Sequence, residues 1–326
     1  LQLWDNLKFK TSYGADLSFW GYDGYRPLYY LRSGESSTQS SAYSRKEDGT
    51  VWQLENVLMY DKSIDKPSFS GLLGQAAQKS SGSYLYGSRN NITNYSRPYI
   101  DASTGLAANA DRDAAGAPSV DATLASIFAR ASYNYDERYM LQVTVRRDGS
   151  SRFGPNNHYA VFPSFSLGWN LTNEKFMNKR PNWLTTTKIR LSWGKNGNEN
   201  IGNFKYTVLT SPGNNAIFGS SENVINGVKA SGLANPDLKW EESEQLDFGL
   251  DFGFFNNALT FTADYYKKKT NGMLMEMNIP FYVGEAKPIG NVGKMENSGI
   301  ELEAAYKFRV SDWNFRVSAN ASYLKN

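Results

Sequence analysis

The chain has 326 residues, no cysteine, a formal net charge of +3 and a mean hydropathy of −0.55. The small net charge, spread along the chain, argues against a nucleic-acid partner, and the lack of cysteine excludes disulfides and thiolate metal sites. No run of about 18 apolar residues occurs, which excludes a transmembrane helix but not a membrane barrel, whose alternating strands keep the mean hydropathy low.

Apolar and polar side chains alternate with a period of two along most of the chain. Near its start, Leu7 and Phe9 flank Lys8, and this spacing continues through the segment. Successive side chains of a strand point to opposite faces, so each such segment has one apolar and one polar face. The pattern predicts an all-β chain of about eleven strands. We expect these strands at 7–19, 51–60, 69–78, 127–135, 139–145, 161–171, 189–193, 246–254, 259–268, 300–310 and 313–323.

Short and long connections alternate between the predicted strands. Short turns are expected at 61–66, 136–138, 256–257 and 311–312, with an intermediate connection at 172–187 that holds a helical turn at 173–178. Long loops are expected at 20–50, 82–121, 149–159, 196–239 and 272–296. In an up-and-down meander this alternation places all tight turns at one end and all long loops at the other, as in outer-membrane barrels.

Two β architectures fit the alternation, because the apolar face is buried in a soluble sandwich and meets lipid in a barrel. The barrel is favoured by strands longer than the usual length of about 5–6 residues. Tyr and Trp at the ends of the apolar faces suit membrane interfaces. We therefore predict an antiparallel up-and-down transmembrane β-barrel segment, about half of a barrel of roughly 22 strands. The alternative is a soluble β-sandwich that binds carbohydrate.

The segment 139–155, YMLQVTVRRDGSSRFGP, illustrates the prediction. Its first half alternates cleanly, and its second half breaks into a charged loop that contains glycine. The side chains expected to face lipid are Tyr139, Leu141, Val143 and Val145. Those expected to face the lumen are Gln142, Thr144 and Arg146.

Several stretches resemble the barrel of SusC/RagA-type TonB-dependent outer-membrane transporters. They are VRRDGSSRFGPNNHYAVFPSFSLGW at 145–169, IRLSWGKNGNENIG at 189–202, NPDLKWEESEQLDFGLDFGFFNNALTFTADYYKKKTNGML at 235–274 and NVGKMENSGIELE at 291–303. The resemblance is strongest over 121–310 and weaker over the first 120 residues.

The resemblance implies active import across the outer membrane of a Bacteroidetes-type bacterium, through a barrel embedded in outer-membrane lipid. The substrates would be oligosaccharides or, in some members, peptides. A TonB–ExbB–ExbD system would power the import, and a SusD-like surface lipoprotein would cover the barrel. Residues 1–326 are expected to belong entirely to the barrel, since the family's plug domain, TonB box and signal peptide have no counterpart in this sequence.

Two aromatic segments in predicted loops are the best candidates for substrate contact. They are FWGYDGYRPLYY at 19–30 and YLYGSRNNITNYSRPY at 84–99. Flat rings beside amides can stack on sugars or hold peptide backbones. The alternative is that these rings pack on one another, form the aromatic girdle at the membrane surface or contact the lid. The candidate residues are Trp20, Tyr22, Tyr25, Arg26, Tyr84, Tyr86 and Arg89.

The sequence offers little for catalysis. Its single histidine, His158, lies in a predicted loop, so histidine-based triads and metal clusters lack their parts. Carboxylates pair on one strand face at Glu301 and Glu303, and again at Asp247 and Asp251. Such pairs could serve glycoside hydrolysis, but on strands with this polar alternation we expect them to line the lumen. We expect no enzyme activity, cofactor or metal, and a secreted glycosidase is the third alternative.

Overall fold

The computed structural model describes residues 1–102, 112–119, 121–213, 215–218, 223–225 and 227–326. Strands dominate, and the helices are short 3-10 turns: η1 (Ile100–Ala102), η3 (Leu171–Asn173), η4 (Lys175–Lys179) and η5 (Phe281–Val283). In the described part of the chain, no helix has the length and apolar character needed to cross a membrane.

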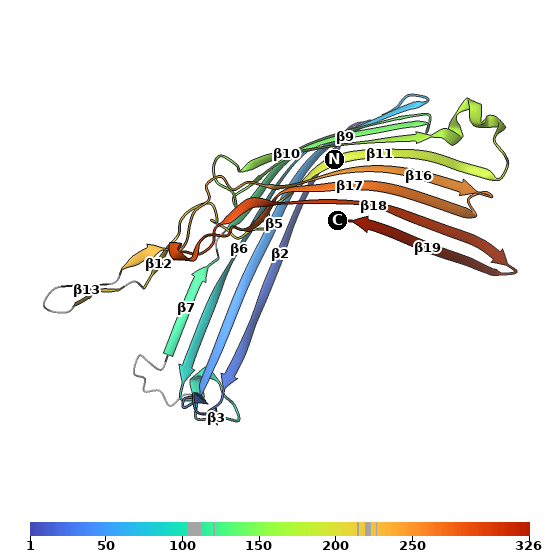
Figure 1. Cartoon of the computed structure of the whole chain (residues 1–326). Coiled ribbons are helices and arrows are strands. Elements are labelled where there is room, and N and C mark those ends of the chain that lie inside the picture. Colours follow the sequence, from blue (N-terminus) through green and yellow to red (C-terminus); the bar gives the residue numbers. More distant parts are fainter. Residues whose placement is uncertain (103–111, 120, 214, 219–222, 226) are drawn as a thin grey trace. The chain divides into compact units, whose positions relative to one another are not determined.

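The main sheet has 13 strands, in the order β1-β2-β5-β6-β8-β9-β10-β11-β16-β17-β18-β19, with β7 paired to β6 (Figure 1). Its long strands are β2 (Leu7–Arg26), β5 (Ser41–Ser63), β6 (Pro67–Asn90), β8 (Ala122–Tyr135), β9 (Tyr139–Ser150), β10 (Tyr159–Asn170), β11 (Leu184–Asn198), β16 (Glu241–Phe254), β17 (Leu259–Glu276), β18 (Ile289–Val310) and β19 (Trp313–Lys325). The short ones are β1 (Gln2–Trp4) and β7 (Arg112–Pro118). Three small hairpins stand apart: β3 (Tyr29–Arg32) with β4 (Glu35–Ser37), β12 (Thr210–Pro212) with β15 (Val228–Ala230), and β13 (Ala216–Phe218) with β14 (Asn223–Ile225).

The predicted all-β, antiparallel up-and-down class is confirmed. Each predicted strand corresponds to one long strand of the sheet, and neighbours in the sheet order follow one another along the chain. The helical turn expected at 173–178 is present as η4. The sheet is open, because β1 and β19 end its order without pairing to each other in the described residues.

The predicted strand ends are wrong on the side of the long loops. β2 continues to Arg26, β5 begins at Ser41 and β6 continues to Asn90, well inside the segments 20–50 and 82–121 that we expected to be loops. Aromatic side chains fit a pleated strand well. In these extensions, pairing with the neighbouring strand gives the backbone N–H and C=O groups their hydrogen-bond partners. The aromatic density that suggested loops is therefore compatible with longer strands.

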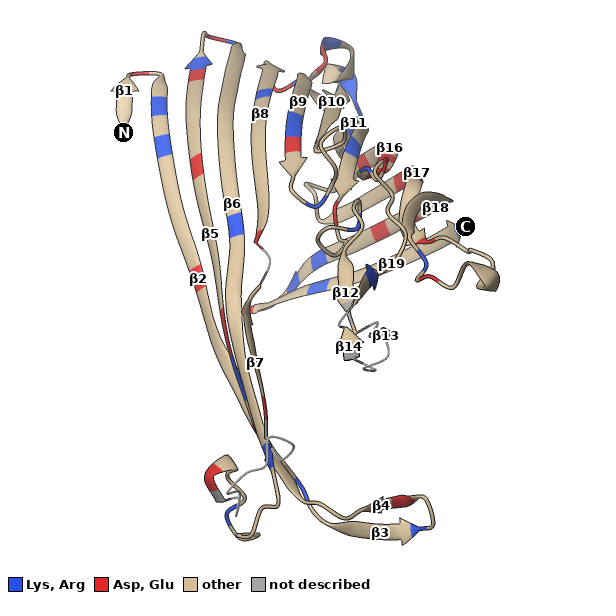
Figure 2. Cartoon of the chain, turned by 90° about the vertical axis from the view of Figure 1, so that its left-hand side faces the viewer, with Lys and Arg blue, Asp and Glu red and all other residues tan. Residues whose placement is uncertain are grey.

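The chain divides into two compact units. The first unit comprises Leu1–Thr11, Glu55–Ala76 and Leu124–Asn326, and the second comprises Ser12–Leu54 and Ala77–Thr123. Charged residues of both signs are spread over many strands and loops rather than gathered in one block (Figure 2).

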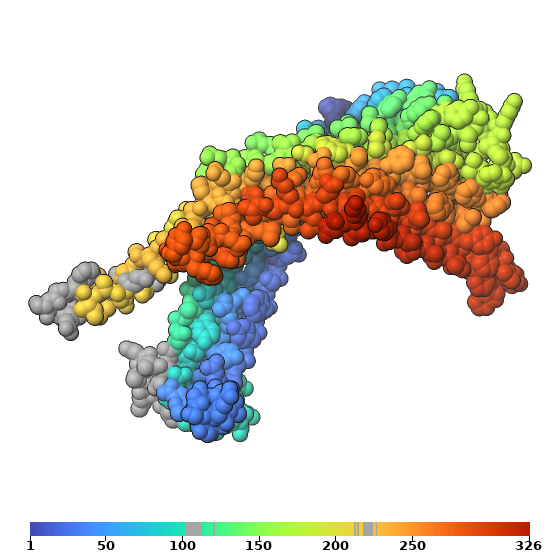
Figure 3. Space-filling model, in the orientation of Figure 1, coloured from blue at the N-terminus to red at the C-terminus, as the bar shows by residue number. Residues whose placement is uncertain are grey.

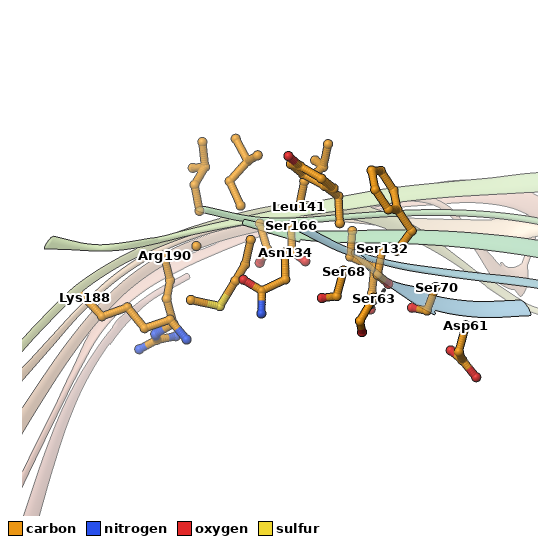
Figure 4. A pocket seen from close by; sticks show the side chains of 18 of the residues that line it. Asp61, Ser63, Ser68, Ser70, Ser132, Asn134, Leu141, Ser166, Lys188 and Arg190 are labelled. Carbon is orange, nitrogen blue, oxygen red and sulfur yellow. Dashed lines mark hydrogen bonds between the residues drawn. The ribbon is translucent and has the colours of Figure 1, made fainter. Parts of the chain in front are cut away.

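The sheet of the first unit has two chemically different faces. On β9, Leu141, Val143 and Val145 are 40%, 42% and 44% exposed, and the polar side chains between them are half-buried on the other side. Across the strands Leu141 lies opposite Leu167, and Val143 lies opposite Phe165. We call this side the apolar face, and the side of Gln142 the polar face. Figure 4 shows Leu141 on one side of the ribbon and Ser132 and Arg190 on the other.

No second large sheet covers the apolar face in the described residues, where the remaining sheets are two-stranded hairpins. A soluble sandwich needs such a sheet, because its apolar faces are buried against each other. The described residues therefore agree with the predicted barrel wall and not with the sandwich alternative, and the predicted assignment of β9 side chains to an apolar and a polar face is confirmed.

A buried hydrophobic cluster lies where long loops of the first unit meet its strands. It consists of Phe153, Phe162, Ile201, Leu238 and Trp240, and we call it the loop core. The ring of Trp240 lies 5.2 Å from that of Phe153 and 5.5 Å from that of Phe162. Its indole Nε1 donates to the backbone oxygen of His158 at 3.0 Å. The loop core therefore joins the β9–β10 loop to the end of the β11–β16 loop.

Two of the long loops are also joined to each other. A Cβ added at Gly232 would lie 3.5 Å from the Cβ of Ala286. Nearby, the side-chain amide of Asn235 donates to the backbone oxygen of Ile289 at 2.9 Å. In the space-filling view, yellow side chains lie beside orange-red ones at the base of the projecting loops (Figure 3). The two loops are therefore in contact near Gly232 and Asn235.

Candidate functional site

The polar face of the first unit carries a hollow of about 620 Å³. Its polar side chains are mostly short hydroxyls and amides, and they point to the same side of the sheet (Figure 4). The hydroxyls belong to Ser63, Ser68, Ser70, Ser132, Ser166 and Ser192. Asp61, Lys188 and Arg190 supply charge. We call this feature the serine hollow.

Arg190 is fixed by carboxylates from the next two strands of the sheet. Its Nε donates to Oδ2 of Asp251 at 2.7 Å, and its Nη2 lies 2.9 Å from Oδ1 of Asp264. The hydroxyl of Thr262 also donates to Asp251, at 3.3 Å. These contacts tie β11, β16 and β17 together, because charge-assisted bonds to a planar guanidinium hold a defined geometry.

A second hollow, of about 360 Å³, lies on β17, β18 and β19 and contains carboxylates. Asp264 stands directly opposite Glu301 in the strand pairing, and Glu303 lines the same hollow. We call it the acidic hollow. Like charges directly opposite each other disfavour close approach, so this part of the polar face differs in chemistry from the serine hollow.

The second unit contains a cluster of aromatic rings on β2, β5 and β6. Trp20 and Tyr22 are stacked with ring centroids 6.0 Å apart, and Tyr22 meets Tyr43 edge-on at 6.0 Å. The guanidinium of Arg45 lies 4.2 Å from the centroid of the Tyr84 ring. A hollow of about 590 Å³ is lined by residues that include Trp20 and Tyr84.

The predicted substrate residues are on strands, not on loops. Trp20, Tyr22, Tyr25 and Arg26 are on β2, and Tyr84, Tyr86 and Arg89 are on β6. The structure brings Trp20, Tyr22 and Tyr84 to the aromatic cluster. Tyr25 instead contacts Tyr95, with centroids 6.4 Å apart. Their contact with a substrate stays a prediction.

At the opposite, short-turn end of the first unit, Asp136 joins two turns. Arg138 Nη2 lies 2.5 Å and Lys66 Nζ lies 3.2 Å from its Oδ2. The hydrogen bond from Arg138, and then that from Lys66, hold the pKa of Asp136 below its ordinary value. The β5–β6 and β8–β9 turns are thereby linked by charge.

Glu174 anchors the η3–η4 segment at the same end. The Tyr139 hydroxyl donates to its carboxylate at 2.5 Å, and the Trp169 indole Nε1 donates at 3.0 Å. These two hydrogen bonds, with a smaller contribution from the charge of Arg138, lower the pKa of Glu174. The side chain is buried, so the ionised form is held by specific donors.

The serine hollow and the Arg190 ion pairs were not identified from the sequence. Alternation places Ser132, Gln142 and Ser166 on the polar face, but isolated serines carry no motif. Their proximity depends on the register, in which Gln142 lies opposite both Ser132 and Ser166. Register between strands is not readable from single segments.

These features define a class of protein. An exposed apolar face, aromatic side chains near the turn end, a polar opposite face and long loops at one end are the properties of a transmembrane β-barrel wall.

Comparison with known proteins gives the family. The model of the family "TonB dependent receptor-like, beta-barrel" matches residues 2–326. The chain therefore belongs to the TonB-dependent receptor-like β-barrel family, whose members are receptors and transporters of the bacterial outer membrane rather than enzymes.

Individual relatives support the resemblance to SusC and RagA. TonB-dependent receptor P3 of Formosa agariphila is 33% identical over 325 residues, covering 99% of this chain and 31% of P3. TonB-dependent receptor SusC of Bacteroides thetaiotaomicron is 37% identical over 210 residues, covering 63% of this chain and 20% of SusC. The RagAB peptide importer in its "closed-closed" state matches with a TM-score of 0.86 and 27% identity, over 99% of this chain and 35% of that one. The chain thus spans about a third of the length of P3.

Proposed function

We propose that this chain forms part of the barrel of an active importer that carries oligosaccharides or peptides across the outer membrane. The observation that carries the proposal is the similarity to the RagAB peptide importer over 99% of the chain, with a TM-score of 0.86. Residues 1–326 then form one stretch of barrel wall, and the carboxylates of the polar face line a route rather than catalyse a reaction.

The two faces of the sheet support a transport role. Apolar side chains such as Val143 meet lipid, while the polar face presents hydroxyls, amides and ion pairs to a hydrated interior. A wall of this kind lets a polar solute pass without contact with hydrocarbon.

The proposed partners are those expected of a SusC/RagA-type transporter. Energy would come from a TonB–ExbB–ExbD system acting through parts of the protein outside residues 1–326, and a SusD-like surface lipoprotein would cover the loop end. The similarity to SusC and to the RagAB importer supports this assignment.

The aromatic cluster of the second unit is the proposed contact surface for cargo. Its rings are accessible, with Trp20 51% and Tyr22 45% exposed. Rings of this size can stack on sugar rings or on flat peptide groups. The adjacent Arg45 guanidinium, paired with Glu47, offers hydrogen-bond donors beside them.

The import proposal is tested with the full-length protein in its own bacterium. A wild-type strain and a strain lacking the gene are fed a mixture of casein peptides and plant and algal oligosaccharides, and mass spectrometry follows each compound. We expect a set of peptides or oligosaccharides that only the wild type depletes, and that it stops depleting when an uncoupler collapses the proton-motive force. Identical depletion by both strains would contradict import.

The contact surface is tested with Trp20→Ala combined with Tyr84→Ala. We expect binding of the imported compounds to de-energised cells to weaken by about tenfold or more, because each of the two lost ring contacts is worth about 0.5–1.5 kcal/mol. Leu17→Ala, a change on the same strand β2, is the control and should leave binding unchanged. Unchanged binding by the double variant would show that cargo is held elsewhere.

A further inference from the structure

We infer that the serine hollow is a transit site for the imported solute, and that the solute passes along the β5–β11 side of the wall rather than along β17–β19. The inference rests on the proposed function of import and adds where the route runs. Its ligand is a hydroxyl- or amide-rich solute, the chemistry that sugars and peptides share.

The hydroxyls of the hollow are available for a ligand. Those of Ser63, Ser68 and Ser166 make no hydrogen bond within the described chain, and that of Ser132 reaches Gln142 only at 3.4 Å. None of these serine side chains is fully buried: Ser63 is exposed, and Ser68, Ser132 and Ser166 are half-buried. Their hydroxyls can therefore exchange water for the polar groups of a passing solute.

Serine hydroxyls suit a site through which a solute passes better than a site that binds it tightly. A hydroxyl both donates and accepts, so it can pair with a sugar hydroxyl, a peptide N–H or a peptide C=O without reorientation of the backbone. Each such bond exchanges with water and contributes little net free energy, about 0.5–1.5 kcal/mol. Serines are also short, which leaves the hollow open. A wall of this kind can contact many solutes and release them.

Two lysines without an ion pair in the described residues, Lys62 on β5 and Lys188 on β11, also line the hollow. Lys188 differs in this from its neighbour Arg190, which is held by Asp251 and Asp264. The Lys188 ammonium can therefore attract a carboxylate, such as the end of a peptide or a uronic acid, to the hollow.

The acidic hollow offers the opposite environment. Glu301 and Glu303 there have no ion pair in the described part of the chain, and Asp264 stands directly opposite Glu301. Carboxylates hold their water strongly and repel other carboxylates. A neutral or anionic solute therefore encounters a lower barrier along the serine hollow. The two hollows lie on the polar face of the same unit, so each can serve as control for the other.

The first test blocks each hollow in the full-length protein. Ser132→Phe and Ser166→Phe place rings in the serine hollow, and Asn320→Phe and Ser322→Phe place them in the acidic hollow. At equal amounts of folded protein in the outer membrane, we expect the first pair to slow depletion of the imported compounds by about tenfold, because narrowing a route limits passage. The second pair should stay within about twofold, and binding to de-energised cells should be unchanged in all four.

The outcomes separate this inference from the proposed function. If the wild type imports but both pairs slow it equally, or neither does, the route along the serine hollow is wrong and import stands. If the wild type and the deletion strain deplete the same compounds, the proposed import function is wrong. The chemical identity of the depleted compounds shows whether the cargo is a peptide or an oligosaccharide.

The second test asks whether another segment of the longer protein permanently fills the hollow. The chain has no cysteine, so Ser166→Cys gives one reporter within it, with Ser322→Cys as the matched position in the acidic hollow. We expect a small neutral maleimide to label Ser166→Cys in energised cells, and the imported compounds to slow that labelling but not the labelling of Ser322→Cys. Complete protection of Ser166→Cys under all conditions would overturn the transit site.

Discussion

On β9, neighbouring residues lie on opposite faces of the sheet and so have different surroundings. Val143 is 42% exposed on the apolar face, and Gln142 is half-buried on the polar face, where it accepts a hydrogen bond from Ser132. Lipid cannot solvate a charge, whereas a hydrated interior can. The effect of a substitution is therefore set by the face on which it falls.

Replacing Val143 by Arg should impair barrel assembly, at a cost of about 2–4 kcal/mol for a charge on the lipid face near the midplane. Gln142→Arg, one residue away, is the matched control and should assemble normally. Heat-modifiable mobility of the full-length protein in outer-membrane fractions measures the folded fraction. Equal folding of the two variants would show that Val143 does not face lipid.

Glu174 predicts a pH dependence at the short-turn end. Its pKa is lowered by the bonds from Tyr139 and Trp169, so its stabilising contribution is complete above the unfolded pKa of about 4.3 and is lost as pH falls through the lower folded value. The protection of residues 171–183 from hydrogen exchange, taken relative to the intrinsic exchange rate at each pH, should therefore fall in strong acid and stay constant between pH 6 and about 8.

The Glu174→Gln variant isolates this carboxylate from Asp136, whose pKa is also lowered. The variant should exchange faster than the wild type at neutral pH, and the difference between them should vanish in strong acid. A difference that persists at low pH would assign the effect to packing instead of charge.

At the level of elements, the family motifs coincide with the loop core. Phe153 and Phe162 come from the resembling segment 145–169, while Leu238 and Trp240 come from 235–274. Residues from both segments therefore build one packed junction between two loops and β10.

Replacing Trp240 by Ala should loosen this junction, at a cost of about 3–5 kcal/mol for a buried aromatic side chain. We expect proteases added to whole cells to cleave the β9–β10 and β11–β16 loops, while the strands stay protected. Phe281→Ala is the control, since that side chain is fully exposed. Unchanged loop protection in the Trp240 variant would mean that other contacts hold the loops.

The sequence was enough to predict that each long strand exists, but not where each strand ends. Period-two alternation identified every long strand, because each has one apolar and one polar face. It stopped at Phe19 on β2, whereas pairing continues to Arg26. Past the point where the alternation stops, strand pairing depends on the neighbouring strand and not on the local sequence pattern.

At the scale of the whole molecule, the exposed apolar face decides where the protein can reside. Leu141, Phe165 and Phe248 are each more than a third exposed on adjacent or nearby strands. A continuous surface of this kind is not tolerated in water by a monomeric soluble protein.

The full-length protein should therefore be monodisperse only in detergent or in a bilayer. Size-exclusion chromatography with light scattering should show aggregation once detergent falls below its critical micelle concentration. A monodisperse species in plain buffer would contradict the barrel.

Local alternation and the asymmetry of the connections were enough to predict an antiparallel barrel wall and the two faces of β9, because side-chain direction in a strand follows from backbone geometry. The family came separately, from the resemblance of segments such as 145–169 and 235–274. The tertiary structure decided what several strands build together. Ser132, Gln142 and Ser166 meet across β8, β9 and β10, and Arg190 finds its carboxylates on β16 and β17. These sites depend on register, which is set by pairing between distant segments and leaves no trace in any one of them.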